Sequence, residues 1–181
     1  MRKNVVSVAV LAAALAGCAS DNVKKVAYDP ATDARIRVYF GVSTHFYFNI
    51  ACEPKRGSLG YGGGGGMAVA KPRKLHLGNN VIGMPVPDDA YRYYDEYVVK
   101  ANQPLTITAD VGGRRDDGIL VWVTANQHAA RMFVPQPGRD YEMYPGNPQG
   151  RLELNVRQLN VTDGQIRTQP VRVDSAPLCA G

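Results

Sequence analysis

Residues 36–52 read IRVYFGVSTHFYFNIAC, and this stretch decides the fold. Its even-numbered positions, from Ile36 to Cys52, are all apolar except Thr44, whereas the odd-numbered positions include Arg37 and His45. A period of two is that of a β-strand with one face turned toward a core. We expect a turn within residues 41–44, which would make the stretch a β-hairpin, although one long bent strand has the same pattern.

The rest of the chain after residue 52 also has the pattern of short strands. Apolar runs occur at residues 74–77, 93–100, 105–111, 119–124, 131–135, 141–144, 151–161 and 166–173. Asp116-Asp117-Gly118 and Asp163-Gly164 predict tight hairpin turns, because Asp-Gly tolerates a positive φ. The apolar phase changes between Val156 and Leu159, which predicts a β-bulge near residues 157–158. The predicted fold class is all-β, an antiparallel β-sandwich of about seven to nine strands.

The N-terminus has the parts of a secretory signal. Arg2 and Lys3 precede an apolar run at residues 5–15, which is too short for the roughly 20 residues of a spanning helix. The following residues, Leu15-Ala16-Gly17-Cys18, resemble the lipobox of bacterial lipoprotein precursors. That resemblance implies cleavage before Cys18, diacylglycerol on its sulfur and acylation of its amine. The alternative is an ordinary secretory signal with a coincidental cysteine.

The lipobox resemblance also bears on location and domain organisation. Ala19 and Ser20 follow the cysteine, where such lipoproteins retained at the inner membrane usually carry an aspartate. We therefore expect a lipid anchor in the outer membrane, facing the periplasm. The expected organisation is a signal peptide at residues 1–17, a lipidated cysteine and flexible tether at 18–34, and a β-sandwich domain at 35–181.

With Cys18 assigned to lipid, Cys52 and Cys179 remain, an even pair in an oxidising compartment. We predict a disulfide between them. The alternative, a metal site, would need these thiolates together with His45, His76 or His128, and none of these has paired-ligand spacing. The sequence therefore predicts no metal and no other cofactor.

Charge gives little reason to expect a nucleic-acid partner. Loss of Arg2 and Lys3 with the signal peptide lowers the formal net charge from +5 to +3. The chain also lacks a dense basic stripe interleaved with aromatic residues.

Two further segments resemble parts of small Gram-negative lipoproteins. They are Tyr97 to Ile107 and the Phe-x-x-x-x-Gly-x-x-Tyr pattern of residues 133–141. Many such proteins have prealbumin-like or immunoglobulin-like sandwich domains of unknown function, so the resemblance implies the fold class and no catalytic residue. The chain departs from the pattern at Asn102, where these turns usually have glycine.

Sequence motifs for catalysis are weak. Residues 60–65 satisfy G-x-G-x-x-G only within a run of glycines, and Pro72 follows too soon for the helix that a dinucleotide site requires. The chain has no Gly-x-Ser-x-Gly motif. Asp95 and Glu96 are adjacent on a predicted strand and so point to opposite faces. We expect a protein that is not an enzyme.

Two groups of residues are candidate binding sites. Lys55, Arg56, Lys71, Arg73 and Lys74 flank the glycine run and could meet phosphorylated lipid or another anionic surface. Tyr91, Tyr93, Tyr94 and Tyr97 could stack on sugar rings or form a protein interface. A solvated loop and ordinary core packing are the alternatives. The favoured function is an envelope accessory or protein-interaction module, and the alternative is a binding module for cell-wall glycan or lipopolysaccharide.

Overall fold

The structure is a computed structural model that describes residues 26–55, 66–70, 78–116, 121–146 and 148–180. The described residues form two five-stranded sheets, which confirms the predicted all-β sandwich, with ten strands rather than seven to nine. The strands are β1 Asp33–Tyr39, β2 Ser43–Phe48, β3 Gly66–Val69, β4 Tyr94–Lys100, β5 Leu105–Asp116, β6 Val121–Phe133, β7 Asp140–Gly146, β8 Glu153–Thr162, β9 Gln165–Val171 and β10 Asp174–Ser175. A 3₁₀ turn, η1 Pro148–Gly150, precedes β8.

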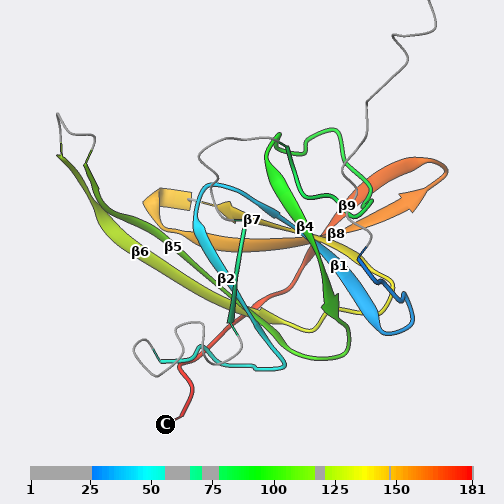
Figure 1. The fold of residues 1–181 in the computed structure, drawn as a ribbon, viewed down its shortest axis with the longest axis horizontal. Coiled ribbons are helices and arrows are strands. Elements are labelled where there is room, and N and C mark those ends of the chain that lie inside the picture. Colours follow the sequence, from blue (N-terminus) through cyan, green and yellow to red (C-terminus); the bar gives the residue numbers. More distant parts are fainter. Residues whose placement is uncertain (1–25, 56–65, 71–77, 117–120, 147, 181) are drawn as a thin grey trace, which may run out of the picture.

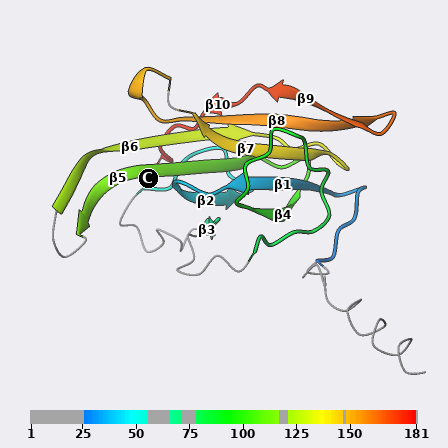
Figure 2. The same ribbon diagram turned by 90° about the horizontal axis from the view of Figure 1, so that it is seen from above.

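The first sheet has the order β4-β1-β7-β8-β9 and the second has the order β10-β6-β5-β2-β3. All neighbours are antiparallel except β1 and β7, which run parallel. Figures 1 and 2 show the two layers, with the long β5–β6 hairpin projecting from one end and the β8–β9 hairpin from the other.

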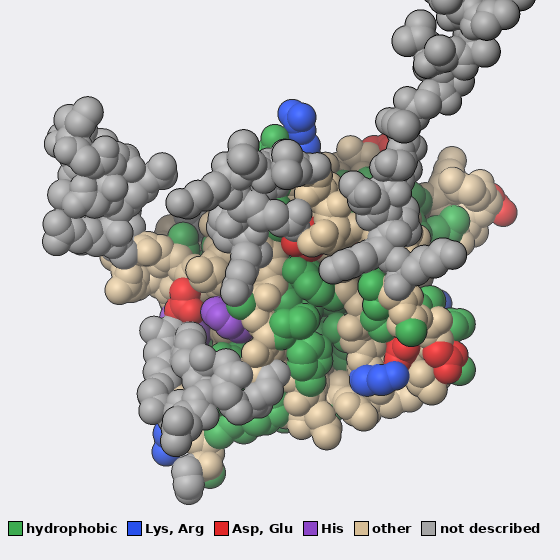
Figure 3. All heavy atoms as spheres, viewed as in Figure 1, with side chains coloured by type: hydrophobic (Ala, Val, Ile, Leu, Met, Phe, Trp, Pro, Cys, Tyr) green, Lys and Arg blue, Asp and Glu red, His purple; other side chains and the backbone are tan. Residues whose placement is uncertain are grey.

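The core lies between the two sheets and is built by alternate residues of each strand. Its members include Ala34, Ile36 and Val38 of β1, Phe46 of β2, Leu105, Ile107 and Ala109 of β5, Tyr141 and Met143 of β7, and Leu154 and Val156 of β8. Burying the larger of these side chains, such as Ile36, Phe46 and Leu105, contributes roughly 1.5 to 3 kcal/mol each. Hydrophobic side chains also reach the surface over the middle of the face shown in Figure 3.

The predicted hairpin at residues 36–52 is wrong, and so is the single bent strand. β1 pairs with β4 and β7 in the first sheet, whereas β2 pairs with β3 and β5 in the second. The chain crosses between the layers around Gly41, which has a φ of 136°. The apolar alternation continues across this crossing because even-numbered residues of both strands face the same core from opposite sides.

Both predicted hairpins are present. Asp116, the last residue of β5, pairs with Val121, the first residue of β6, while the turn between them, residues 117–120, lies outside the described residues. Thr162 pairs with Gln165, and the two turn residues, Asp163 and Gly164, have φ values of 52° and 74°. Two successive positive φ values are those of a type I′ turn.

The predicted β-bulge in β8 is wrong. β8 keeps a continuous register with β7 and β9 through residues 157 and 158. Leu159 is instead buried on the outer face of the first sheet, opposite to the core-facing Val156, and Val161 is exposed. The register shift that does occur lies between Val111 and Gly113, in the pairing of β5 with β6. The predicted run at 74–77 lies outside the described residues.

Candidate functional site

The outer face of the first sheet carries a buried group of charged side chains. Arg37 on β1 lies in register with Glu96 on β4 and Glu142 on β7. Its Nη2 lies 2.6 Å from Glu96 Oε1, and its Nη1 lies 2.6 Å from Glu142 Oε1. The side chains of Arg37 and Glu142 are 0% exposed, and that of Glu96 is 1% exposed. Strand alternation places these residues away from the apolar core, yet water does not reach them.

Arg157 on β8 extends this group toward the surface. Its Nε donates to Glu142 Oε2 at 2.6 Å, and its Nη1 and Nη2 donate to the two carboxylate oxygens of Asp89 at 2.6 and 2.8 Å. The hydrogen bond to Asp89 is the largest influence on Arg157, and it raises the pKa of the guanidinium. Arg37, Glu96, Glu142, Arg157 and Asp89 are called the charge network below.

Tyr39 completes the polar contacts of Glu142. Its hydroxyl donates to Glu142 Oε1 at 2.6 Å. Burial of the ring, followed by this hydrogen bond to a carboxylate, raises the pKa of Tyr39 well above its ordinary value. The phenol is therefore a fixed hydrogen-bond donor, and it is not available to release a proton at neutral pH.

Residues 78–93, called the roof segment, cover the charge network. Glu96 Oε2 accepts hydrogen bonds from three consecutive backbone N–H groups, those of Ile82, Gly83 and Met84, at 2.6, 3.1 and 3.2 Å. The carbonyl of Met84 in turn accepts a hydrogen bond from Arg37 at 3.3 Å. Gly83 has a φ of 89°, a conformation that side-chain-bearing residues rarely adopt. Buried charge thus fixes the middle of a segment that has no regular secondary structure.

The first residues of the roof segment are tied to the start of β4. Asn80 N donates to Asp95 Oδ1 at 2.8 Å, and Glu96 N donates to the Asn80 carbonyl at 2.8 Å. Asn79 Nδ2 donates to the carbonyl of Arg92 at 3.0 Å, which closes the loop on itself. Asp95 and Glu96 face opposite sides of β4, as predicted.

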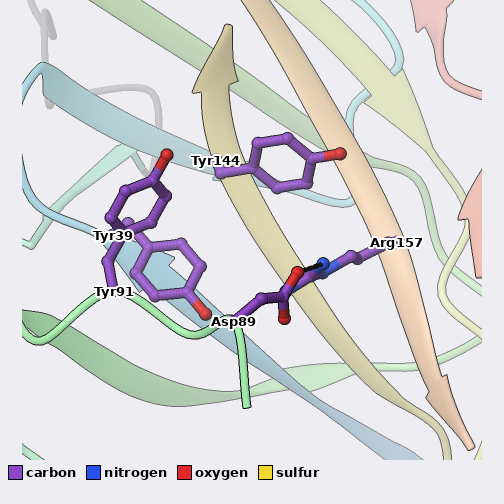
Figure 4. A pocket seen from close by; sticks show the side chains of 5 residues that line it. All are labelled: Tyr39, Asp89, Tyr91, Tyr144 and Arg157. Atoms are coloured by element: carbon purple, nitrogen blue, oxygen red, sulfur yellow. Dashed lines mark hydrogen bonds and ion pairs between the residues drawn. The ribbon is translucent and has the colours of Figure 1, made fainter. Parts of the chain in front are cut away.

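A pocket of about 370 Å³ opens between the roof segment and the sheet. This pocket is called the tyrosine pocket below. It is lined by Tyr39, Asp89, Tyr91, Tyr144 and Arg157 (Figure 4). The rings of Tyr39 and Tyr91 meet edge to face, with centroids 5.2 Å apart. The guanidinium carbon of Arg157 lies 5.6 Å from the centre of the Tyr144 ring. Aromatic surface and a fixed ion pair therefore share one concave site.

The structure places only one of the four predicted tyrosines in this pocket. Tyr91 is 66% exposed there. Tyr94 is buried, with the guanidinium of Arg37 4.4 Å from its ring centre. Tyr93 is 43% exposed and lies beside Arg92. Tyr97 faces the core, where its ring packs edge to face on Phe46 and its hydroxyl accepts a hydrogen bond from Ala70 N. Alternation along β4 separates residues that are neighbours in sequence.

Sequence reasoning missed the other lining residues. Tyr39 and Tyr144 lie within the predicted strand segments 36–52 and 141–144 but were not proposed as site residues, and Arg157 was placed at a predicted bulge. The available signal was alternation: Tyr39 shares the odd-numbered face of β1 with Arg37. Of the predicted basic site, Lys55 is exposed, whereas Arg56, Lys71, Arg73 and Lys74 lie outside the described residues, as does Cys18.

The predicted disulfide between Cys52 and Cys179 is present, with Cα atoms 5.0 Å apart. It joins two segments on the outer face of the second sheet, where Glu53 N donates to the Pro177 carbonyl at 2.8 Å and Cys179 N donates to the Glu53 carbonyl at 2.9 Å. The C-terminal tail is thereby held beside the chain that follows β2.

His128 on β6 links this disulfide-bearing region to the sheet. Its Nε2 lies 2.9 Å from Glu53 Oε2 and its Nδ1 lies 2.9 Å from Asp110 Oδ1. An ionised carboxylate only accepts hydrogen bonds, so both contacts form as hydrogen bonds to ionised carboxylates only when the ring is protonated on both nitrogens. Burial lowers the pKa of His128, but the hydrogen bonds to the two carboxylates outweigh burial, so that the pKa lies above its ordinary value.

Among the described residues, no cluster of three or more His, Cys, Asp or Glu side chains has an arrangement that could hold a metal ion. No helix within the described ranges has the length and apolar character needed to cross a bilayer. Comparison of the chain with known protein families, curated proteins and solved structures finds no match.

Proposed function

We propose that this protein is a non-catalytic lipoprotein of the bacterial outer membrane that binds a ligand of the envelope in its tyrosine pocket. The observation that carries the binding proposal is the pocket itself, which combines three aromatic rings with one ion pair in about 370 Å³. That volume lies within the range of roughly 300 to 1,000 Å³ of ordinary ligand sites, which are also mostly aromatic and apolar with a few fixed polar groups.

The chemistry of the lining residues supports binding rather than catalysis. Each charged group of the pocket is committed to a partner of opposite charge: Asp89 to Arg157, and Arg157 also to Glu142. Such pairing fixes side chains in one geometry and keeps them ionised. A general acid or base needs a pKa near the working pH, and a strong ion pair moves a carboxyl group away from it.

Export and anchoring are supported by two independent features. The lipobox at residues 15–18 would place two or more acyl chains on Cys18, which is enough for stable attachment to a bilayer. The disulfide between Cys52 and Cys179 fits an oxidising compartment such as the periplasm. The residues between Cys18 and the start of β1 at Asp33 would connect the lipid to the folded domain.

Retention on purified envelope polymers tests the proposal. The mature lipidated protein, solubilised in detergent, is incubated with purified peptidoglycan and with lipopolysaccharide, and the bound fraction is measured for the wild type, Tyr91→Ala and Tyr93→Ala. Tyr93→Ala is the matched control because Tyr93 is a half-exposed tyrosine of the same segment outside the pocket lining.

We expect one of the polymers to retain the wild type and Tyr93→Ala but not Tyr91→Ala. Crosslinking in whole cells tests the alternative, in which the pocket binds a protein partner. If neither polymer retains the protein and a crosslinked protein partner is lost in Tyr91→Ala, the pocket serves a protein interface, and the ligand-binding proposal is wrong.

A further inference from the structure

The structure favours one ligand chemistry for the tyrosine pocket. We infer that it recognises an uncharged sugar surface, and not the phosphate or carboxylate groups of envelope polymers. This inference rests on the proposed function and names the class of ligand for the same site.

The charges around the pocket argue against an anionic ligand. The charge network contains two guanidinium groups, those of Arg37 and Arg157, and three carboxylates, those of Glu96, Glu142 and Asp89. Its formal charge is therefore −1. Among the described residues that line the pocket, the cation is Arg157, whose paired Nη atoms face both oxygens of Asp89. A phosphate would have to displace Asp89 from this bidentate pair and would meet a net negative site.

The aromatic rings fit the apolar face of a sugar ring. Tyr91 is 66% exposed, and its edge-to-face contact with Tyr39 holds its ring in place. Tyr39 is only 2% exposed and its hydroxyl donates to Glu142, so it supports the Tyr91 ring, and Tyr91 is the residue that offers ring surface to a ligand. A pyranose presents C–H groups on one face, and such a face packs on an aromatic ring without needing a charge.

The ion pair fits the hydroxyl groups at the edge of the same sugar. In the hydrogen bonds above, Arg157 uses three of its five N–H groups, and each oxygen of Asp89 accepts one. The remaining N–H groups of Arg157 are donors, and they lie beside the remaining lone pairs of Asp89, which are acceptors. Neighbouring hydroxyls of a sugar each donate and accept, so they match this arrangement, whereas the ionised oxygens of a phosphate only accept.

Tyrosine rings can also bind an ammonium ligand in an aromatic cage, which is the alternative to a sugar. The third ring, that of Tyr144, already lies 5.6 Å from the guanidinium carbon of Arg157. A second cation in the pocket would lie close to the first, so the arrangement favours a neutral ligand over a cationic one.

The test uses the mature lipidated protein in detergent and three defined probes: a neutral oligosaccharide of N-acetylglucosamine, inorganic phosphate, and choline. Affinity is measured by titration calorimetry for the wild type, Tyr91→Ala, Tyr93→Ala and Asp89→Asn, at low and at high salt. We expect only the oligosaccharide to bind, with an affinity that changes little with salt. Tyr91→Ala should weaken it by about tenfold, equivalent to one lost stacking contact, and Tyr93→Ala should leave it unchanged.

Asp89→Asn distinguishes neutral, anionic and cationic ligands, because it should change their affinities in different directions or by different amounts. Removing this negative charge should weaken a neutral sugar modestly, strengthen an anion and strongly weaken a cation. Suppose that an envelope polymer retains the protein in a Tyr91-dependent way, and that phosphate blocks this retention but the oligosaccharide does not. This result would overturn the neutral-sugar inference, while the proposed function would stand. Tyr91-dependent choline binding would overturn it as well. Loss of Tyr91 dependence for every probe and both polymers would overturn the proposed function itself.

Discussion

Replacing Arg37 with methionine tests whether the charge network holds the first sheet together. Methionine fills much of the same space but leaves Glu96 and Glu142 without their shared cation, at side-chain exposures of 1% and 0%. Breaking a buried ion pair in this way costs about 3 to 5 kcal/mol, because an uncompensated charge remains in a medium of low polarity.

The remaining partners set the expected value near the lower end of that range. Glu96 would still accept three backbone N–H groups of the roof segment, and Glu142 would still be bonded to Tyr39 and Arg157. We therefore expect a loss of about 3 kcal/mol in the free energy of unfolding. For a domain of this size that loss lowers the melting temperature by roughly 6 to 12 °C.

Arg35→Met is the matched control for this experiment. Arg35 lies two residues away on the same strand face and pairs with Asp140 at 2.6 Å, but the two side chains are 19% and 11% exposed. Water can solvate the remaining carboxylate, so we expect a loss of only about 1 kcal/mol. Urea unfolding of the purified proteins gives both values. An Arg37→Met loss no larger than that of Arg35→Met would refute the argument that burial makes Arg37 essential.

Three further predictions concern the disulfide, the histidine and the anchor. Cys52→Ala should lower the free energy of unfolding by up to about 5 kcal/mol, as expected for a bridge across 127 residues. The double variant Cys52→Ala/Cys179→Ala should have the same stability as the single variant. If non-reducing mass spectrometry finds the peptides of the two cysteines separate, the bridge is contradicted. Because the pKa of His128 is raised in the folded state, its stabilisation is fully present below its unfolded pKa of about 6.5 and is lost as pH rises through the higher folded value. His128→Gln should remove that component of the pH dependence in urea unfolding, and an unchanged profile would show that the two carboxylates do not depend on the ring. Cys18→Ser should abolish acyl labelling and membrane fractionation, so persistent labelling would place the lipid elsewhere.

The parts of the fold that local pattern controls could be predicted from the sequence. Alternation gives the strands, and Asp163-Gly164 gives a turn whose positive φ values follow from its residue types. The disulfide followed from the number of cysteines and the expected compartment. Alternation does not reveal which sheet a strand joins. The apolar residues stay at even-numbered positions whether the chain forms a hairpin within one sheet or crosses to the other sheet. This is why β1 and β2 were paired wrongly.

The site was less accessible to prediction than the fold. The tyrosines of residues 91–97 were grouped by sequence proximity, but alternation and the roof segment send them to different surroundings. Those that line the pocket with Tyr91 come from β1 and β7, about fifty residues away on either side. Only the strand register, with β1 parallel to β7, brings Tyr39 close to Glu142 and Tyr144. A single sequence does not contain that register.

The charge network explains how an irregular segment can form one wall of the tyrosine pocket. Asp89 and Tyr91 belong to the roof segment, so no strand fixes their positions. Glu96 binds the middle of that segment through three backbone N–H groups, and Arg157 binds its later part through Asp89. Apolar residues of equal volume could bury the same surface at lower desolvation cost, but they would not fix the direction of a backbone N–H group. The buried charges therefore contribute position more than stability, and the recognition of hydroxyl groups that we propose for the pocket would depend on that position.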